Sequence, residues 1–238
     1  MDSNDGITIK RLNVNELNPN EELINYKIIL VGDSSVGKTC LLMRAVNNKF
    51  TDNYQATIGF EFLLMYFQVN NVKIKLQIWD TCGQEIYRSL IQGFYRNTAV
   101  TILVFSKTSR NSFDNLGGWV KDVKNNTEQE MPIFLVGNKC DMESKAQVVT
   151  KEEGEEFAKQ YNLKYYSDVS AKTGYKVLDT FEEVAKIVYQ DFCMQRNPRQ
   201  KLNKMTLEKK DDGLIEKPKK NVVKKWILFN IKLVFIFN

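Results

Sequence analysis

One glycine-rich loop constrains the fold of this chain more than any other feature of its sequence. Residues 32–39 read GDSSVGKT and match the pattern GxxxxGK[ST] at every fixed position. The apolar run of residues 28–31 before them is typical of a buried strand, and residues 38–48 have the apolar spacing of a helix. A strand that leads through a glycine turn into a helix directs backbone N–H groups and the positive end of the helix toward one point. The sequence therefore predicts a loop that cradles phosphate groups.

Two side chains of this loop and three later residues complete the predicted phosphate site. The Lys38 ammonium can reach the terminal phosphates of a nucleotide, and the Thr39 hydroxyl can coordinate Mg²⁺. Asp80 follows an apolar strand, where a carboxylate supplies the oxygen that a hard cation prefers. Gly83 would let the backbone approach a γ-phosphate, and Gln84 has the donor and acceptor needed to orient an attacking water. Lys38 and Gln84 are therefore the expected catalytic residues.

A second polar loop predicts which base the nucleotide carries. Residues 138–141 read NKCD and follow another buried apolar run. The Asp141 carboxylate can accept hydrogen bonds from both N1 and N2 of guanine, a pair of donors that adenine lacks. Asn138 can tie neighbouring loops together, and the stem of Lys139 can cover the plane of the base. Residues 170–172, Ser-Ala-Lys, follow the last apolar run and can donate a backbone N–H to O6 of guanine.

Alternating apolar runs and amphipathic stretches predict the fold class. They indicate an α/β fold with a mostly parallel, six-stranded sheet, one antiparallel strand, and helices on both faces. Such a sheet binds ligands beyond the carboxyl ends of its strands, so the motifs should converge on one edge. Strands are expected over residues 28–31, 60–69, 72–79, 100–105, 132–136 and 164–169, and helices over residues 38–48, 86–96, 112–126, 151–160 and 177–192.

Composition divides the chain into three parts. Residues 1–25 are polar and asparagine-rich, with no apolar core of a signal peptide, so a flexible leader facing the cytosol is expected. Residues 26–195 carry the alternating pattern of the folded domain. Residues 196–238 hold 12 lysines and arginines against 4 aspartates and glutamates, so the tail carries the excess positive charge of the chain. This distribution argues against nucleic-acid binding and favours attraction of the tail to an anionic membrane surface.

The last residues of the tail leave two interpretations open. Basic residues lead into the apolar and aromatic run of residues 226–238, which Lys232 interrupts. This run is shorter than the roughly 20 apolar residues that a membrane-spanning helix needs. It could bind shallowly at a membrane interface with help from the lysines. Alternatively, this C-terminus has been altered by splicing or by an error in the gene model.

The ordered motifs resemble those of the Ras superfamily of small GTPases. GDSSVGKT, Thr57, DTCGQ, NKCD and SAK carry the resemblance, which covers roughly residues 26–192. It implies a monomeric P-loop switch with the small-GTPase fold, which binds GTP and GDP with Mg²⁺. The implied nucleotide contacts are Asp33, Ser34, Ser35, Val36, Gly37, Lys38, Thr39, Cys40, Phe50, Thr57, Gly83, Asn138, Lys139, Asp141, Ser170, Ala171 and Lys172, and the implied metal ligands are Thr39, Thr57 and Asp80.

The resemblance also implies how hydrolysis is controlled. Water oriented by Gln84 would attack in line, and Thr57 would bind Mg²⁺ only in the GTP state. No arginine lies just before Thr57, where a built-in arginine finger could stand. Intrinsic hydrolysis should therefore be slow, and an activating protein should supply the arginine, while an exchange factor would renew the GTP.

Within the superfamily the chain is most similar to Rab proteins. Residues 58–62 look like the Rab switch I signature, and residues 75–81 look like the strand that enters switch II. The resemblance implies effector contacts at Ile58, Phe62, Trp79 and Phe94. It further implies effector recruitment in vesicle trafficking, at the cytoplasmic face of Golgi or endosomal membranes. Rab proteins end in cysteines that receive prenyl groups, whereas no cysteine follows Cys193 here.

Two other classes of protein remain open from sequence. A P-loop enzyme that uses ATP, such as a kinase, would share the phosphate loop, although Asp141 argues for guanine. A nucleotide-binding scaffold with little hydrolysis would share the whole pocket, although Gln84, Thr57 and Thr39 argue against it. Four scattered cysteines and the lack of histidine argue against a zinc site and indicate reduced thiols in the cytosol.

Overall fold

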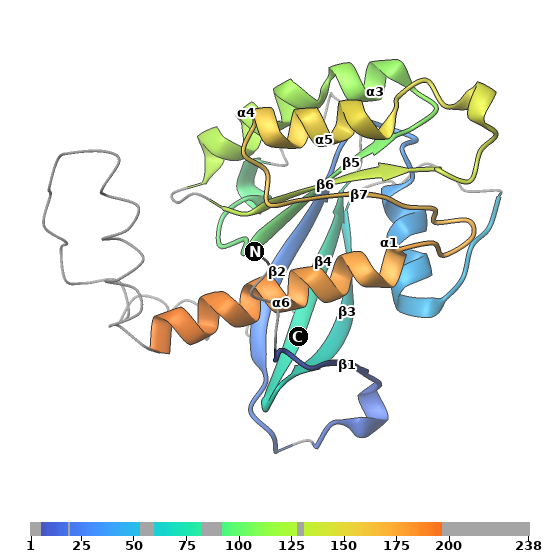
Figure 1. The fold of residues 1–238 in the computed structure, drawn as a ribbon. Coiled ribbons are helices and arrows are strands. Elements are labelled where there is room, and N and C mark those ends of the chain that lie inside the picture. The colour runs from blue at the N-terminus through green and yellow to red at the C-terminus, as the bar shows by residue number, and fades with distance from the viewer. Residues whose placement is uncertain (1–5, 19, 53–59, 82–91, 128–130, 197–238) are drawn as a thin grey trace, which may run out of the picture. The chain divides into compact units, whose positions relative to one another are not determined.

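A single twisted sheet organises the computed structural model, which describes residues 6–18, 20–52, 60–81, 92–127 and 131–196 (Figure 1). Within these residues, seven strands pair in the order β1-β3-β4-β2-β5-β6-β7. Strands β4, β2, β5, β6 and β7 run parallel, β3 pairs antiparallel with β4, and β1 pairs antiparallel with β3. The strands are β1 (Ile9–Leu12), β2 (Ile24–Val31), β3 (Phe60–Val69), β4 (Val72–Thr81), β5 (Val100–Ser106), β6 (Ile133–Asn138) and β7 (Tyr165–Asp168). The predicted α/β class is confirmed.

Helices cover both faces of the sheet. Helices α1 and α6 lie on one face, and α3, α4 and α5 lie on the other (Figure 1). None of the helices in the described residues is both long and apolar enough to cross a membrane. The helices are α1 (Lys38–Asn47), α3 (Arg110–Asp114), α4 (Leu116–Asn126), α5 (Lys151–Gln160) and α6 (Val177–Arg196), and short 3₁₀ helices are η1 (Val14–Glu16), η3 (Gln92–Phe94) and η4 (Ser144–Ala146).

Two apolar cores result from the alternation of side chains along the central strand β2. Ile28 and Leu30 point into the core shared with α1 and α6, whereas Ile29 and Val31 point into the core shared with α3, α4 and α5. All four side chains are fully buried. A strand buried on both faces carries a continuous apolar run, which is why this strand could be recognised from sequence.

The N-terminal segment corrects the prediction of a flexible leader and of six strands. Residues Ile9–Leu12 form strand β1, which pairs with β3 so that Ile9 lies opposite Val69 and Leu12 opposite Tyr66. Leu12 is buried, and the Arg11 guanidinium donates a hydrogen bond of 2.6 Å to the carbonyl of Val46 in α1. Four residues are too short a run to show alternation among polar neighbours. These residues form a strand because they pair with the open edge of β3, a long-range contact that the local sequence could not reveal.

Several predicted boundaries also change. The predicted helix over residues 112–126 is two helices, α3 and α4, which meet at Asn115, and Ser109 caps α3 by accepting a hydrogen bond from the N–H of Ser112. The predicted helix over residues 86–96 lies mostly outside the described residues, and its described end is the 3₁₀ turn η3. Helix α5 has its predicted bounds because Thr150 and Glu153 form a capping box. The compact unit runs to Cys193, and of the second unit, Met194–Asn238, only residues 194–196 are described.

Candidate functional site

The phosphate loop joins β2 to α1 in a conformation that requires glycine at two positions. Gly32 and Gly37 both have positive φ, 136° and 94°. A Cβ atom at Gly32 would lie 2.1 Å from the carbonyl oxygen of Val104, and one at Gly37 would lie 2.5 Å from Nδ2 of Asn138. Helix α1 begins directly after the loop, so its first N–H groups and its positive end face the loop. The loop has the geometry of an anion cradle.

Lys38 lies under this loop and is only 5% exposed. Its Nζ donates hydrogen bonds to the carbonyls of Gly32, at 2.8 Å, and Asp33, at 2.7 Å. The two carbonyls hold the ammonium against the loop. A buried ammonium fixed in this way can neutralise phosphate charge without first losing side-chain freedom.

Thr39 and Asp80, two of the three predicted magnesium ligands, lie in direct contact. The Thr39 hydroxyl donates to Oδ2 of Asp80, whose side chain is 1% exposed. The other oxygen, Oδ1, is buried and has no hydrogen-bond partner among the described residues. Burial raises the pKa of Asp80 to about 6, against the opposing effects of Thr39 and Lys38.

This arrangement fits a hard divalent cation. An unpartnered carboxylate oxygen is costly in the protein interior, and a cation bound there would satisfy it. Within the described part of the chain no group of three acidic, cysteine or histidine side chains could hold a metal. A cation between Thr39 and Asp80 would therefore need further oxygen ligands, such as phosphate, water or the predicted ligand Thr57, which lies outside the described residues.

Asn138 joins the phosphate loop to the loop that follows β7. Its Nδ2 donates to the carbonyl of Val36 at 2.9 Å, and its Oδ1 accepts from the N–H of Ala171 at 3.1 Å. Lys139 adds a second link, because its Nζ donates to the carbonyl of Ser35 at 2.9 Å. Three loops that are distant in sequence are thereby held at one edge of the sheet.

A hydrogen bond from the buried Ser170 orients the Asp141 carboxylate. Ser170 Oγ donates to Oδ1 of Asp141 at 2.6 Å and accepts from the N–H of Thr173 at 3.0 Å. Asp141 itself is exposed, so its carboxylate can meet a ligand while Ser170 stays in the interior. A carboxylate oriented in this way suits the paired N–H donors of guanine.

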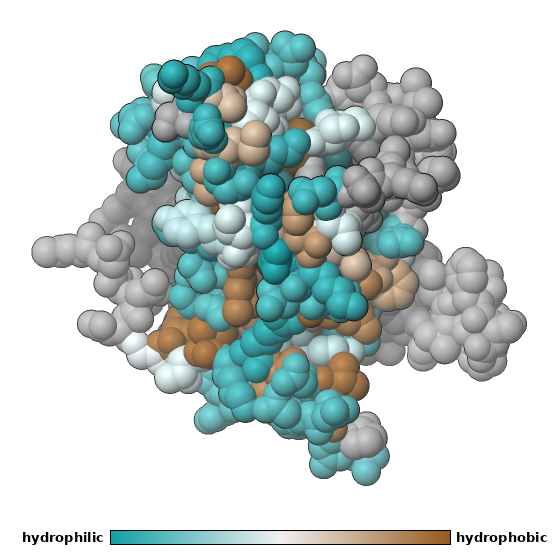
Figure 2. Space-filling model, turned by 90° about the vertical axis from the view of Figure 1, so that its right-hand side faces the viewer, coloured by the Kyte–Doolittle hydropathy of each residue, from teal (hydrophilic) through white to brown (hydrophobic). Residues whose placement is uncertain are grey.

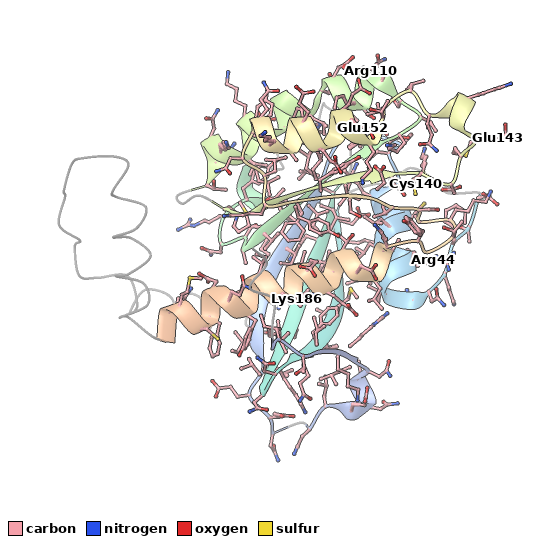
Figure 3. The ribbon with its side chains drawn as sticks, in the orientation of Figure 1. Arg44, Arg110, Cys140, Glu143, Glu152 and Lys186 are labelled. Carbon is pink, nitrogen blue, oxygen red and sulfur yellow. The ribbon has the colours of Figure 1, made fainter. Side chains whose placement is uncertain are left out.

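Arg44 is a site residue that motif analysis missed. From α1, its guanidinium donates to the carbonyls of Ala171, at 2.8 Å, and Lys172, at 2.6 Å (Figure 3). It also donates to Oδ1 of Asn48 at 3.0 Å, which fixes the end of the helix. The only sequence signal is an arginine on a helix that begins at a phosphate loop, and that signal does not name its partners.

Two predicted nucleotide contacts have other roles in the structure. The Asp33 carboxylate accepts hydrogen bonds from Asn115 Nδ2 at 2.7 Å and Trp119 Nε1 at 2.8 Å, so its side chain braces the loop against α4. Phe50 is partly buried and packs against the core beneath α1 and α6. For both residues, contact with a nucleotide stays a prediction.

The remaining predicted residues divide into two groups. Those described at the carboxyl edge of the sheet are connected by the loops and hydrogen bonds above, and Figure 2 shows that polar side chains cover much of the face beside them. Thr57, Ile58, Gly83 and Gln84 lie outside the described residues. The structure brings together Asp33, Ser34, Ser35, Val36, Gly37, Lys38, Thr39, Cys40, Asp80, Asn138, Lys139, Asp141, Ser170, Ala171 and Lys172.

A separate aromatic cluster lies on β3, β4 and η3. The rings of Phe62 and Trp79 stack with their centroids 5.1 Å apart, and Trp79 lies 5.5 Å from Phe94. Phe62 is 50% exposed. Lys27, which the sequence did not single out, places Nζ 5.4 Å from the centre of the Trp79 ring and donates to the carbonyl of Phe94 at 2.6 Å. The cluster is therefore anchored to β2.

A comparison with protein-family models gives this geometry its context. Residues 27–190, well over half of the chain, match the model of the Ras family. Proteins of this family are GTPases that bind GTP or GDP with Mg²⁺ and meet regulators and effectors. The phosphate loop, the Thr39–Asp80 pair and the oriented Asp141 lie within the matched residues. The chain belongs to the Ras family and is a small GTP-binding switch.

Proposed function

We propose that this protein is a Rab-like switch that recruits effector proteins in membrane trafficking. The observation that carries the proposal is the stack of Phe62, Trp79 and Phe94, with Phe62 half exposed. Aromatic side chains that are rigidly held and partly exposed suit protein recognition, because they offer apolar area at little cost in side-chain entropy. Phe62 and Trp79 also belong to the two Rab-like sequence signatures, residues 58–62 and residues 75–81.

We further propose how the nucleotide is held. Lys38 and the N–H groups at the start of α1 would bind the β- and γ-phosphates, and Asp141 would select guanine. Thr39 and Asp80 would hold Mg²⁺, which screens phosphate charge when bound, and Thr57 would join them in the GTP state. Asn138, Lys139, Ser170 and Arg44 support the proposal through the hydrogen bonds that fix the base-side loops.

Hydrolysis is proposed to be slow until an activating protein binds. Gln84 would orient the attacking water, and the missing arginine would come from that partner, for which a gain of about 10³- to 10⁵-fold is typical. The test is stimulated hydrolysis with a Rab-activating domain. Gln84→Leu should remove the stimulation while leaving GTP binding intact, whereas full stimulation in the variant would contradict the assigned role of Gln84.

Location at Golgi or endosomal membranes is proposed from the Rab-like signatures and the basic tail. Twelve lysines and arginines in residues 196–238 would attract the tail to an anionic cytoplasmic leaflet. Binding should therefore weaken as ionic strength rises. Sedimentation of the full chain with vesicles that contain anionic lipid, at low and high salt, tests this step separately from nucleotide binding.

The trafficking proposal is tested in the cells that make the protein. Full-length Gln84→Leu protein, tagged at its N-terminus, should accumulate on internal membranes and delay the transport of a secreted reporter. Adding Phe62→Ala should abolish the delay. Adding Val14→Ala instead removes a different exposed apolar side chain and should change nothing. An unchanged delay in the Phe62→Ala protein would overturn the assignment of this cluster as the effector surface.

A further inference from the structure

A largely buried ion pair lies at the ends of β5 and β7, next to the loops that carry Asn138 and Ser170. Lys107 follows the last residue of β5, and its side chain is 2% exposed. Its Nζ lies 2.9 Å from Oδ2 of Asp168, the last residue of β7, whose side chain is 19% exposed. Burying an ion pair costs desolvation energy and adds little stability on average, so stability alone gives little reason for this pair.

The pair passes over β6, which lies between β5 and β7. Gly137 leaves room for it, and a side chain at this position would crowd both the pair and the Phe105 ring. A Cβ atom at Gly137 would lie 2.7 Å from Oδ1 of Asp168 and 3.1 Å from Cδ of Lys107. Gly137 immediately precedes Asn138, the residue that links the phosphate loop to the loop after β7.

Asp168 has a second fixed partner. The Tyr166 hydroxyl donates to its Oδ1 at 2.5 Å, so the two carboxylate oxygens accept from two different donors. Burial and the bond to Asp168 raise the pKa of Tyr166, which keeps the hydroxyl protonated. The Tyr166 ring fills the space above Gly154 of α5, where a Cβ atom would lie 2.3 Å from Cζ. The carboxylate therefore has one well-defined position.

The backbone of Lys107 forms hydrogen bonds with both ends of the loop between β6 and α5. Its N–H donates to the carbonyl of Asn138 at 2.9 Å, and its carbonyl accepts from the N–H groups of Val148, at 2.9 Å, and Val149, at 3.3 Å. The loop between these anchors carries Lys139 and Asp141. Lys107 is thus the one described residue whose backbone meets both ends of that loop while its side chain reaches β7.

Asp168, the acidic residue of the pair, lies close in sequence to the serine that orients Asp141. Asp168 is two residues before Ser170, and the intervening Val169 donates to the carbonyl of Gly137 at 2.8 Å and accepts from the N–H of Cys140 at 3.1 Å. Ser170 then donates to Asp141. A shift of the end of β7 relative to β5 would therefore move Ser170 relative to Asp141.

We infer that Lys107 and Asp168 are positioning residues for base selection. The buried pair holds the ends of β5 and β7 at the separation that lets Asp141 accept both guanine N–H groups. The inference rests on the guanine assignment of Asp141. Without the pair, the Asp141 carboxylate keeps its charge but loses its orientation. The N2 amino group of guanine then adds less binding energy.

The test compares GDP with inosine diphosphate, which lacks the N2 amino group. Dissociation rates of both fluorescently labelled nucleotides are measured on full-length protein with Mg²⁺ present. Lys107→Met should speed GDP dissociation by about ten-fold, the scale of one lost hydrogen bond to a charged group, and should change inosine diphosphate much less. The ratio of the inosine diphosphate rate to the GDP rate should therefore fall toward one.

Two further variants separate positioning from general stability. Arg110→Met removes an exposed cation paired with Glu153, on α3 in the helical layer of Figure 3, and should leave the ratio unchanged. Asp168→Asn keeps an acceptor for Tyr166 while removing the charge. It should reproduce the fall in the ratio and serves as the primary test if Lys107→Met does not fold.

The outcomes distinguish the inference from the proposed site. Equal acceleration of both nucleotides, or no change in either, would overturn the positioning role of Lys107 and Asp168. Unmodified protein that holds GDP and inosine diphosphate equally well would instead contradict the guanine assignment itself. A Lys107→Met, Asp168→Asn double variant that recovers thermal stability but not discrimination would support the inference most directly.

Discussion

Two regions of the sheet hold their side chains in opposite ways: the base side, where guanine is proposed to bind, and the hairpin side, where the antiparallel β3–β4 hairpin carries the proposed effector cluster. On the base side, Asn138, Lys107 and Ser170 are buried polar side chains whose hydrogen bonds are directed at other loops. On the hairpin side, Phe62 is half exposed and stacks on Trp79, whose buried Nε1 has no partner in the described part of the chain. A small rigid base is recognised by oriented polar groups, whereas a protein partner is recognised by apolar area that gives up its water.

The largest expected effect is on the base side. Asp141→Asn replaces two acceptor interactions with guanine by an amide that complements xanthine, so GDP affinity should fall by about 100-fold or more. Affinity for xanthosine diphosphate should rise in the same variant. Calorimetry of nucleotide-stripped protein with each nucleotide measures both changes, and unchanged GDP binding would remove Asp141 from the site.

An intermediate effect compares the two sides within one measurement. Asn138→Ala leaves the carbonyl of Val36 and the N–H of Ala171 without a partner, which should lower the free energy of unfolding by about 2–5 kcal/mol. Phe62→Ala removes a half-exposed ring and should cost about 1 kcal/mol. Urea unfolding of both variants in saturating GDP measures the difference. Equal costs would mean that the hairpin side is as tightly packed as the base side.

The smallest effect concerns pH and the lysine beneath the aromatic cluster. Burial lowers the pKa of Lys27 from 10.5 to about 8 in the folded protein. Between these two values the unfolded chain binds more protons than the folded protein, so the contribution of this group to the free energy of unfolding rises with pH. Lys27→Met should lack that rise.

Urea unfolding at about pH 7.5 and about pH 9.5 measures this contribution as the difference between the unmodified protein and the variant. The upper limit avoids Tyr26, whose pKa is raised to about 12 and whose contribution has the opposite sign at higher pH. An equal rise in both proteins would show that another group titrates there.

The parts of the site that could be predicted are those encoded locally. The phosphate loop depends on consecutive residues, and its glycines, lysine and threonine have fixed spacing because one turn of backbone surrounds a phosphate. The resemblance to Rab proteins singled out Phe62, Trp79 and Phe94; the structure places their rings in contact, and their role as effector contacts stays a prediction. The strand β1 was missed, since four residues with polar neighbours carry too weak a pattern.

The hydrogen bonds and the ion pair that hold the motif loops in place could not be predicted. Asn138 and Val36 are 102 residues apart, and Lys107 and Asp168 are 61 residues apart. Arg44 reaches residues that are more than 120 positions away. A hydrogen bond forms only when donor and acceptor lie within a few tenths of an ångström of the ideal separation. That separation is set by how the strands align in the folded sheet, and neighbouring residues in the sequence do not reveal it.

By itself, the sequence predicted six of the seven strands in the described residues and the phosphate loop, and it predicts guanine through Asp141, because each prediction depends on residues within one turn or one strand. Only the tertiary structure decided that Asp33 braces α4, that Arg44 holds the loop after β7, and that Lys107 pairs with Asp168 across Gly137. These contacts arise where parallel strands end side by side, so they exist only once the sheet has formed.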